Sequence, residues 1–346
     1  MTLGPLMVDL QGPEILPEER DMLRHPLVGS VILFTRNFVD SAQLRALVTQ
    51  IHTLRSPALI VAVDHEGGRV QRFRSGFSLL PPARRLGHEF DASAPSGLAL
   101  ARDMGWLMAA ELRAHGVDLS FAPCVDLDYG VSEVIGDRAF HRRPQAVGQL
   151  SVAYMHGMRD AGMAATAKHF PGHGAVVADS HHALPVDRRE LADMESDIAP
   201  YRILIANGLA AVMVAHVMFP EVDAVPASAS PRWIRGVLRE QLRFQGVVFA
   251  DDMSMAGAAS VGGIVERAEL ALAAGCDVLP VCNHPPSIAA LLDGLKQGQD
   301  PASALRLVRL HGRGRASVED LMSSETWKNC QIALERCRAP PTLSLT

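Results

Sequence analysis

The segment GVVFADDMSM (246–255) begins as a short apolar run and ends in two carboxylates, Asp251 and Asp252. Its hydrophobicity is continuous rather than alternating, which is typical of a strand buried on both faces of a parallel sheet. Seven more runs of this kind recur along the chain, at residues 3–10, 28–34, 58–64, 117–126, 163–169, 209–216 and 276–283. We therefore expect eight buried parallel strands.

Stretches with helical spacing separate the apolar runs, for example at residues 41–55, 96–116 and 266–275. A glycine often ends such a helix just before the next strand, as a left-handed C-terminal cap does; these are Gly116, Gly208 and Gly275. Eight strands alternating with helices predict an α/β fold, a TIM-type (β/α)8 barrel. We expect a single barrel domain over residues 1–300 and a C-terminal helical extension over residues 301–346. A doubly wound open sheet is the alternative.

Composition limits the classes of protein to which the chain can belong. Its 346 residues are 48% hydrophobic and 21% charged, so it can bury a large core. A net charge of −5 gives no reason to expect binding to nucleic acid or to an anionic membrane. We expect no membrane insertion and no secretory signal, because neither a long apolar run nor a basic start followed by an apolar stretch occurs. Five scattered cysteines without CxxC spacing indicate reduced thiols in a cytosolic protein.

Most of the predicted strands end in polar residues, namely Asp9, Asp64, Asp126, Lys168–His169, His216, Asp251–Asp252 and Asn283. In a parallel barrel the carboxyl ends of all strands open onto one mouth, where active sites are built. These residues are far apart in sequence, but the fold should bring them together. They form one candidate site.

The two carboxylates of the opening segment should have different roles. Successive strand residues point to opposite sides, so Asp251 and Asp252 can hardly both cap the helix that follows. One of them should face the mouth. An ionised carboxylate held there suits nucleophilic attack on an electrophilic carbon, or metal binding.

The segment VDHEGGRVQRF (63–73) also begins at a strand end. Gly67 and Gly68 permit a sharp turn, around which Asp64, Arg69 and Arg72 emerge. A carboxylate and a guanidinium accept and donate hydrogen bonds in fixed directions, which suits a polyhydroxylated ligand.

The segment IGDRAFHRRP (135–144), after the fourth strand, offers Arg138 in a similar role. In both segments the alternative is that the charged side chains only shape their loop.

The segment KHFPGHGAVVADSHH (168–182) holds four histidines. His169 and His173 have the HxxxH spacing of a helical zinc site, but Pro171 and its neighbouring glycines rule out a helix here. A metal-dependent barrel hydrolase that gathers His169, His181 and Asp251 stays open, although the first strand lacks the His-x-His pair that begins such sites.

A second feature of this segment is Asp179-Ser180-His181. Two residues of separation let the carboxylate of Asp179 face the imidazole of His181, fix its tautomer and raise its basicity. His181 is therefore a candidate proton shuttle on a glycine-rich loop. The alternative is a pair of solvated loop histidines. Lys168 and His169 close the fifth strand and should point at the mouth.

KHFPGHG followed by DSH, with VDHEGGRVQR upstream and FADDMSM downstream, closely resembles glycoside hydrolase family 3. Within it, the chain is most similar to the single-domain bacterial β-N-acetylglucosaminidases, over residues 3 to about 300. The resemblance implies a cytoplasmic TIM-barrel enzyme with no metal and no other cofactor. It also implies removal of N-acetylglucosamine, with retention of configuration, from muropeptides bearing 1,6-anhydro-N-acetylmuramic acid.

The resemblance also implies roles for individual residues. Asp251 would be the nucleophile, and His181 the general acid/base oriented by Asp179. The residues that hold the sugar hydroxyls and the acetamido group would be Asp64, Arg72, Arg138, Lys168 and His169. Ala250 stands where related members often have Ser or Thr, which does not disturb the chemistry.

Three other functions stay open: a metal-dependent barrel hydrolase, a β-N-acetylglucosaminide phosphorylase, and a catalytically silent sugar-binding barrel. The sequence gives no oligomeric state.

Overall fold

The structure is a computed structural model that describes residues 2–178, 184–296, 300–314 and 316–338. Within that part of the chain, eight parallel strands form one sheet, in the order β10-β1-β2-β3-β6-β7-β8-β9. They are β1 (Leu6–Val8), β2 (Val28–Leu33), β3 (Ile60–Val63), β6 (Leu119–Ser120), β7 (Ala164–Phe170), β8 (Ala211–Val214), β9 (Val247–Ala250) and β10 (Leu279–Val281). Each predicted apolar run coincides with one of these strands, and β7 extends one residue beyond its run.

The sheet closes into a barrel where its two edges meet. Phe249 of β9 forms a parallel bridge with Val278, and the N–H of Ala250 donates to the carbonyl of Val278 at 2.9 Å. The strand order follows the chain around the ring and shows no reversal. The predicted (β/α)8 barrel is confirmed, and the open doubly wound sheet is excluded.

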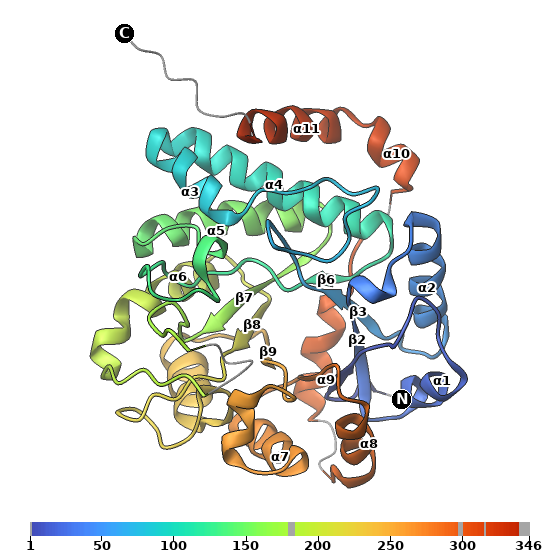
Figure 1. Cartoon of the computed structure of the whole chain (residues 1–346), viewed down its shortest axis with the longest axis vertical. Coiled ribbons are helices and arrows are strands. Elements are labelled where there is room, and N and C mark those ends of the chain that lie inside the picture. The colour runs from blue at the N-terminus through green and yellow to red at the C-terminus, as the bar shows by residue number, and fades with distance from the viewer. Residues whose placement is uncertain (1, 179–183, 297–299, 315, 339–346) are drawn as a thin grey trace.

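Helices surround the barrel, as Figure 1 shows. They are α1 (Pro17–Arg24), α2 (Ser41–Thr53), α3 (Ala83–Ala92), α4 (Ala94–Ala114), α5 (Pro144–Asp160), α6 (Glu195–Ala206), the π-helical η5 (Arg232–Gln241), α7 (Ile264–Ala274), α8 (Pro285–Gly294), α9 (Pro301–Leu307), α10 (Val318–Ser323) and α11 (Glu325–Arg338). Short 3₁₀ turns are η1 (Thr35–Asn37), η2 (Gly136–Arg138), η3 (Leu191–Met194), η4 (Ala227–Ala229), η6 (Ala256–Val261) and η7 (Val308–Leu310). Gly116, Gly208 and Gly275 have φ of 89°, 87° and 117°, so the predicted left-handed caps are confirmed.

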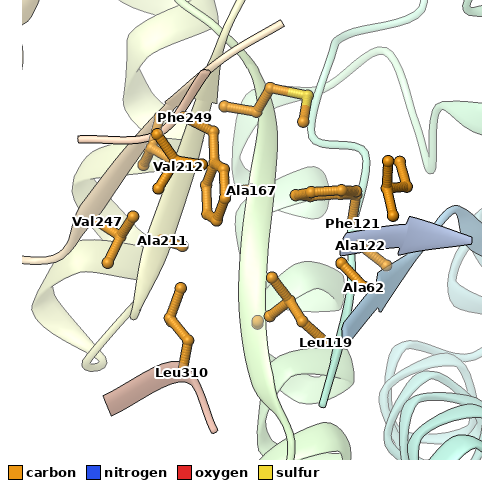
Figure 2. Close-up of a cluster of buried hydrophobic side chains, with 14 of the residues drawn as sticks. Ala62, Leu119, Phe121, Ala122, Ala167, Ala211, Val212, Val247, Phe249 and Leu310 are labelled. Carbon is orange, nitrogen blue, oxygen red and sulfur yellow. The ribbon is translucent and has the colours of Figure 1, made fainter. Parts of the chain in front are cut away.

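The barrel is packed with side chains rather than hollow. Figure 2 shows a cluster in which Phe121 lies near Ala122 and Ala62, and Phe249 near Val212 and Ala167. The rings of Phe121 and Phe249 meet edge to face, with centroids 5.2 Å apart. Leu310, from the segment after the last barrel strand, belongs to the same cluster. A continuous apolar strand is buried on both faces because helices cover it outside and this cluster covers it inside.

At the amino-terminal end of the barrel strands, several groups converge on the buried carboxylate of Asp118. This carboxylate accepts hydrogen bonds from the backbone N–H groups of Val61 and Gly312, both at 3.0 Å. It also contacts His52 at 2.9 Å and Arg113 at 3.1 Å. The segment after residue 300 is thereby attached to the barrel. The domain boundary at residue 300 stays a prediction.

The C-terminal helix α11 packs against α4, on the outside of the barrel (Figure 1). The indole N–H of Trp327 donates to the carboxylate of Glu111 on α4 at 2.9 Å. Ser78 donates to the same carboxylate, through its backbone N–H at 2.8 Å and its hydroxyl at 2.6 Å. Glu111 therefore joins α11 to the loop that contains Ser78.

None of the helices in the described ranges has both the length and the apolar character needed to cross a bilayer. All five cysteines are buried free thiols.

Candidate active site

A cavity of about 570 Å³ lies at the carboxyl ends of the barrel strands. The described residues to which the family resemblance gives a role all line this cavity: Asp64, Arg72, Arg138, Lys168, His169 and Asp251. Of the other predicted strand-end residues, Asp252 and Asn283 also line it, whereas Asp9, Asp126 and His216 do not. Asp179 and His181 lie outside the described residues. Apolar walls, which the sequence did not indicate, come from Phe34, Phe121, Met213 and Met255. The cavity falls within the size range of small-molecule sites.

A short hairpin after β3 positions three charged residues that line the cavity. Arg69 lies in its turn, and Asp64 and Arg72 flank it. Its strands are β4 (His65–Gly67) and β5 (Val70–Gln71), and its turn needs glycine because Gly67 and Gly68 have φ of 112° and 53°. The N–H of Gly68 donates to the carbonyl of Leu80 at 3.0 Å, which fixes the hairpin to the following loop. The guanidinium of Arg69 donates to the carbonyls of Glu133 and Val134, at 2.8 and 2.5 Å. The hairpin is thus fastened to the loop that carries Arg138.

Lys168, near the end of β7, is held between two carboxylates. Its ammonium donates to Asp64 at 2.8 Å and lies 2.6 Å from an oxygen of Glu66. Burial opposes the charge of the ammonium, but the two carboxylates outweigh it and raise the pKa of Lys168 above its ordinary value. Lys168 is therefore charged at neutral pH.

Arg138 forms a two-point ion pair with Glu66. Its Nε and Nη2 donate to the two oxygens of Glu66 at 2.9 and 2.8 Å. Burial raises the pKa of Glu66, but Arg138 and Lys168 lower it further than burial raises it, so the carboxylate stays ionised. Glu66 is not among the site residues predicted from the sequence. The signal that could have found it is its spacing of two from Asp64, which gives both side chains the same side of an extended chain.

His169 is oriented by a buried carboxylate, Asp126. The Nδ1 of His169 lies 2.7 Å from Asp126, which also accepts from the backbone N–H of His173 at 2.7 Å. Burial raises the pKa of Asp126, but His169 and His173 lower it to about 2. Asp126 was noticed as a strand end, but its pairing with His169 was not foreseen. An ionised Asp126 places the Nδ1 proton of His169 toward itself and leaves Nε2 directed away from it.

Asp251 and Asp252 have different hydrogen-bond partners. Asp252 accepts hydrogen bonds from the backbone N–H groups of Ser254 and Cys282, at 3.0 and 3.1 Å, and from the Ser254 hydroxyl at 2.8 Å. Burial raises the pKa of Asp252 to about 6. Asp251 is fixed by its backbone N–H, which donates to Val214 at 3.0 Å, and its carboxylate lines the cavity. Asp252 thus shapes the turn after β9, and its own backbone N–H donates to Oδ1 of Asp251 at 2.8 Å. Both residues line the cavity.

Among the described residues, one group of metal-ligating side chains has its ligand atoms within 4.8 Å of one another: Cys124, Asp126 and His169. One oxygen of Asp126 already receives Cys124 Sγ at 3.3 Å and His169 Nδ1 at 2.7 Å. A metal would have to replace these hydrogen bonds. The alternative group of His169, His181 and Asp251 includes a residue outside the described ranges.

Comparisons with known proteins agree along most of the chain. Residues 6–309 match the family model of the glycosyl hydrolase family 3 N terminal domain. A β-hexosaminidase from Thioalkalivibrio sulfidiphilus is 53% identical over 345 residues, which cover 100% of this chain and 99% of the relative. A β-hexosaminidase from Thiobacillus denitrificans is 56% identical over 313 residues, which cover 90% of this chain and 87% of the relative.

Two crystal structures of NagZ from Neisseria gonorrhoeae have closely similar folds. The complex with N-trifluoroacetyl-D-glucosamine has a TM-score of 0.93 and 43% identity, covering 98% of this chain and 99% of that one. The complex with a zinc ion has a TM-score of 0.92 and 41% identity, with the same coverage.

Replacement of Asp126 by Asn should change how stability depends on pH. The folded pKa of about 2 lies below the ordinary value of about 4. The ionised carboxylate therefore contributes stability that is fully present above pH 4 and is lost as the pH falls toward 2. We expect the parent to lose about 2 kcal/mol more unfolding free energy than Asp126→Asn between pH 6 and pH 2.5. Urea titrations at both pH values measure this, and equal losses would contradict the assigned pairing.

Proposed function

The chain belongs to glycosyl hydrolase family 3 and is a β-hexosaminidase, and we propose that it removes terminal N-acetylglucosamine from peptidoglycan-derived muropeptides. The proposed substrates end in 1,6-anhydro-N-acetylmuramic acid bearing a peptide, and the proposed setting is cytoplasmic recycling of the cell wall. The observation that carries the proposal is the convergence of Asp251 with hydrogen-bonding groups suited to a sugar in one cavity. The binding of an N-acylated glucosamine by the gonococcal relative supports the choice of an aminosugar.

Sugar binding in this cavity would use fixed donors and acceptors around the ring. Asp64 can accept from a hydroxyl while it holds Lys168, and Lys168 and Arg138 can donate. Arg72 lies 3.8 Å from Asp64 and adds another donor. Phe121 and Phe34 give the cavity apolar wall area that can pack against the C–H groups of a pyranose.

The proposed reaction is a double displacement at the anomeric carbon. A carboxylate oxygen of Asp251 attacks this carbon, the glycosidic C–O bond breaks, and His181 protonates the leaving oxygen. His181 then takes a proton from water, whose oxygen attacks the same carbon and releases Asp251. Asp179 would hold the imidazole in position. Two inversions give overall retention of configuration.

The engagement of the other carboxylates supports a histidine as the acid. Most retaining glycosidases use a second carboxyl group roughly 5 Å from the nucleophile. Among the described residues of the cavity, Asp64 is bound to Lys168, and Asp252 is bound to two backbone N–H groups. Glu66 is bound to both Lys168 and Arg138. Because each of these carboxylates already has polar partners in the protein, we assign the proton to His181 rather than to one of them.

A panel of p-nitrophenyl glycosides tests the proposed activity. We expect kcat/KM for the β-N-acetylglucosaminide to exceed that for the β-glucoside by on the order of 100-fold, because the site would bind the acetamido group through hydrogen bonds. Activity should persist in EDTA, and added phosphate should yield no glycosyl phosphate. Loss of activity in EDTA would favour the metal-dependent hydrolase, a glycosyl phosphate product the phosphorylase, and binding without turnover the silent barrel.

Replacement of Asp251 by Asn should abolish turnover of every substrate, even those with very good leaving groups. Formation of the glycosyl-enzyme needs the nucleophile whatever group leaves, so we expect a loss of at least about 1,000-fold in kcat. The matched variant is Asp252→Asn, which should retain turnover because Asp252 shapes the turn. A 5-fluoro glycosyl label located by peptide mass spectrometry should be on Asp251, and a label on Asp252 would reverse the assignment.

Replacement of His181 by Ala should produce a dependence on the leaving group. Sugar leaving groups need protonation as the bond breaks, whereas activated phenolates need little, so the first step should suffer far less on the latter. Deglycosylation still lacks its base, so stopped-flow traces should show a burst, and azide should accelerate turnover. Asp179→Ala should show a milder form, and His173→Ala and His182→Ala no such dependence. Equal slowing of good and poor leaving groups would assign the acid/base role elsewhere.

A further inference from the structure

Glu66 bridges Lys168 and Arg138, two cations to which the proposed function assigns sugar binding. One of its oxygens lies 2.6 Å from the ammonium of Lys168 and 2.8 Å from Nη2 of Arg138, and the other receives Nε of Arg138 at 2.9 Å. The side chain of Glu66 is only 9% exposed, and those of Lys168 and Arg138 are 3% and 11% exposed. Glu66 is absent from the residues that line the cavity, so it faces the cations rather than the ligand.

The contacts of the Lys168 ammonium with Asp64 and Glu66 fix its orientation. An ammonium has three N–H donors and no acceptor. Asp64 takes one donor and Glu66 takes a second. These two carboxylates determine the rotation of the ammonium, and the remaining N–H is the one that can serve a ligand in the cavity that Lys168 lines.

The same bridge fixes the plane of the Arg138 guanidinium. Glu66 takes Nε and one Nη2 donor, and the carbonyl of Val134 takes one Nη1 donor at 3.1 Å. A guanidinium has five donors in a rigid plane, so one N–H on each terminal nitrogen remains. The remaining Nη2 donor is directed at Nε2 of His169 at 3.5 Å, so the N–H left for a ligand is on Nη1. Glu66 thus sets the direction of donors on two different elements of the barrel mouth.

Charge is essential to this arrangement. Two buried cations repel each other and lose hydration, and an ionised carboxylate between them offsets both costs. An amide of the same shape could not replace it, since glutamine would turn an NH₂ group toward at least one N–H donor.

We propose that Glu66 is a positioning residue of the glycoside hydrolase site, which directs the remaining N–H of Lys168 and the remaining Nη1 N–H of Arg138 toward the bound sugar without touching it. This inference rests on the proposed sugar-binding role of the cavity. It predicts that Glu66 acts on substrate binding and not only on folding.

The test compares Glu66→Gln with a matched variant at the other end of the barrel, Asp277→Asn. Asp277 is likewise a buried carboxylate between two cations, Arg239 at 2.9 Å and Arg306 at 2.8 Å, with its side chain 2% exposed. It precedes β10, whereas the cavity lies at the carboxyl ends of the strands. Both variants should unfold at a lower temperature than the parent, because each loses a carboxylate that pairs two guanidinium or ammonium groups.

Only Glu66→Gln should weaken sugar binding. We expect about a tenfold or larger rise in KM for p-nitrophenyl N-acetyl-β-glucosaminide and in the inhibition constant of N-acetylglucosamine. Asp277→Asn should leave both constants unchanged. Glu66→Asp keeps the charge but is shorter by one methylene, so it should restore part of the affinity. This variant also decides the question if Glu66→Gln does not fold.

Each outcome is decisive. Constants within about twofold of the parent in Glu66→Gln, or in Glu66→Asp where only that variant folds, would overturn the inference. An equal rise in Asp277→Asn would also overturn it, because the effect would then be structural. Turnover by the parent tests the proposed function separately, and a parent that does not cleave the glycoside refutes that proposal whatever the variants do.

Discussion

Closure of the parallel sheet is the constraint on which the rest of the molecule depends. The bonds between β9 and the residues around Val278 complete the ring, so every strand leaves the barrel at the same end. Asp64, Lys168 and Asp251 come from distant parts of the sequence, and only this geometry makes them neighbours. The packed cluster around Phe121 and Phe249 fills the space below them and forms a solid floor. Chemistry is thereby confined to the mouth.

The mouth holds several largely buried charges that pair with one another within the protein itself. Asp64, Glu66, Lys168 and Arg138 form one connected ionic network. Groups that are already oriented need no reorganisation when a substrate binds, which is the general advantage of a preorganised polar site. The network costs desolvation free energy, which the packing of the large core offsets. Stability of the barrel and readiness of the site are therefore linked.

The fold was predictable from sequence because it depends on local pattern, whereas the site residues were predicted from strand ends together with the motifs that resemble glycoside hydrolase family 3. Continuous apolar runs indicated the strands, and terminal polar residues indicated the mouth. The choice of Asp251 over Asp252 as the nucleophile came from the family resemblance. Pairings between side chains were not predictable, because they depend on which loops meet. Glu66 and Arg138 are 72 residues apart in the sequence. From sequence alone, many other arginines could equally have been the partner of Glu66. The docking of α11 on α4 is likewise a matter of tertiary packing.

The carboxylate of Glu111 connects the end of the chain to its catalytic mouth. It binds Trp327 of α11 on one side and Ser78 on the other, and the loop through Ser78 and Leu80 supports the hairpin that carries Glu66. A ribosome delivers α11 after every barrel element has emerged. Until then, Glu111 lacks its indole partner and the loop lacks part of its support. During synthesis the barrel can close early, but the hairpin gains its full set of contacts only with the last helix.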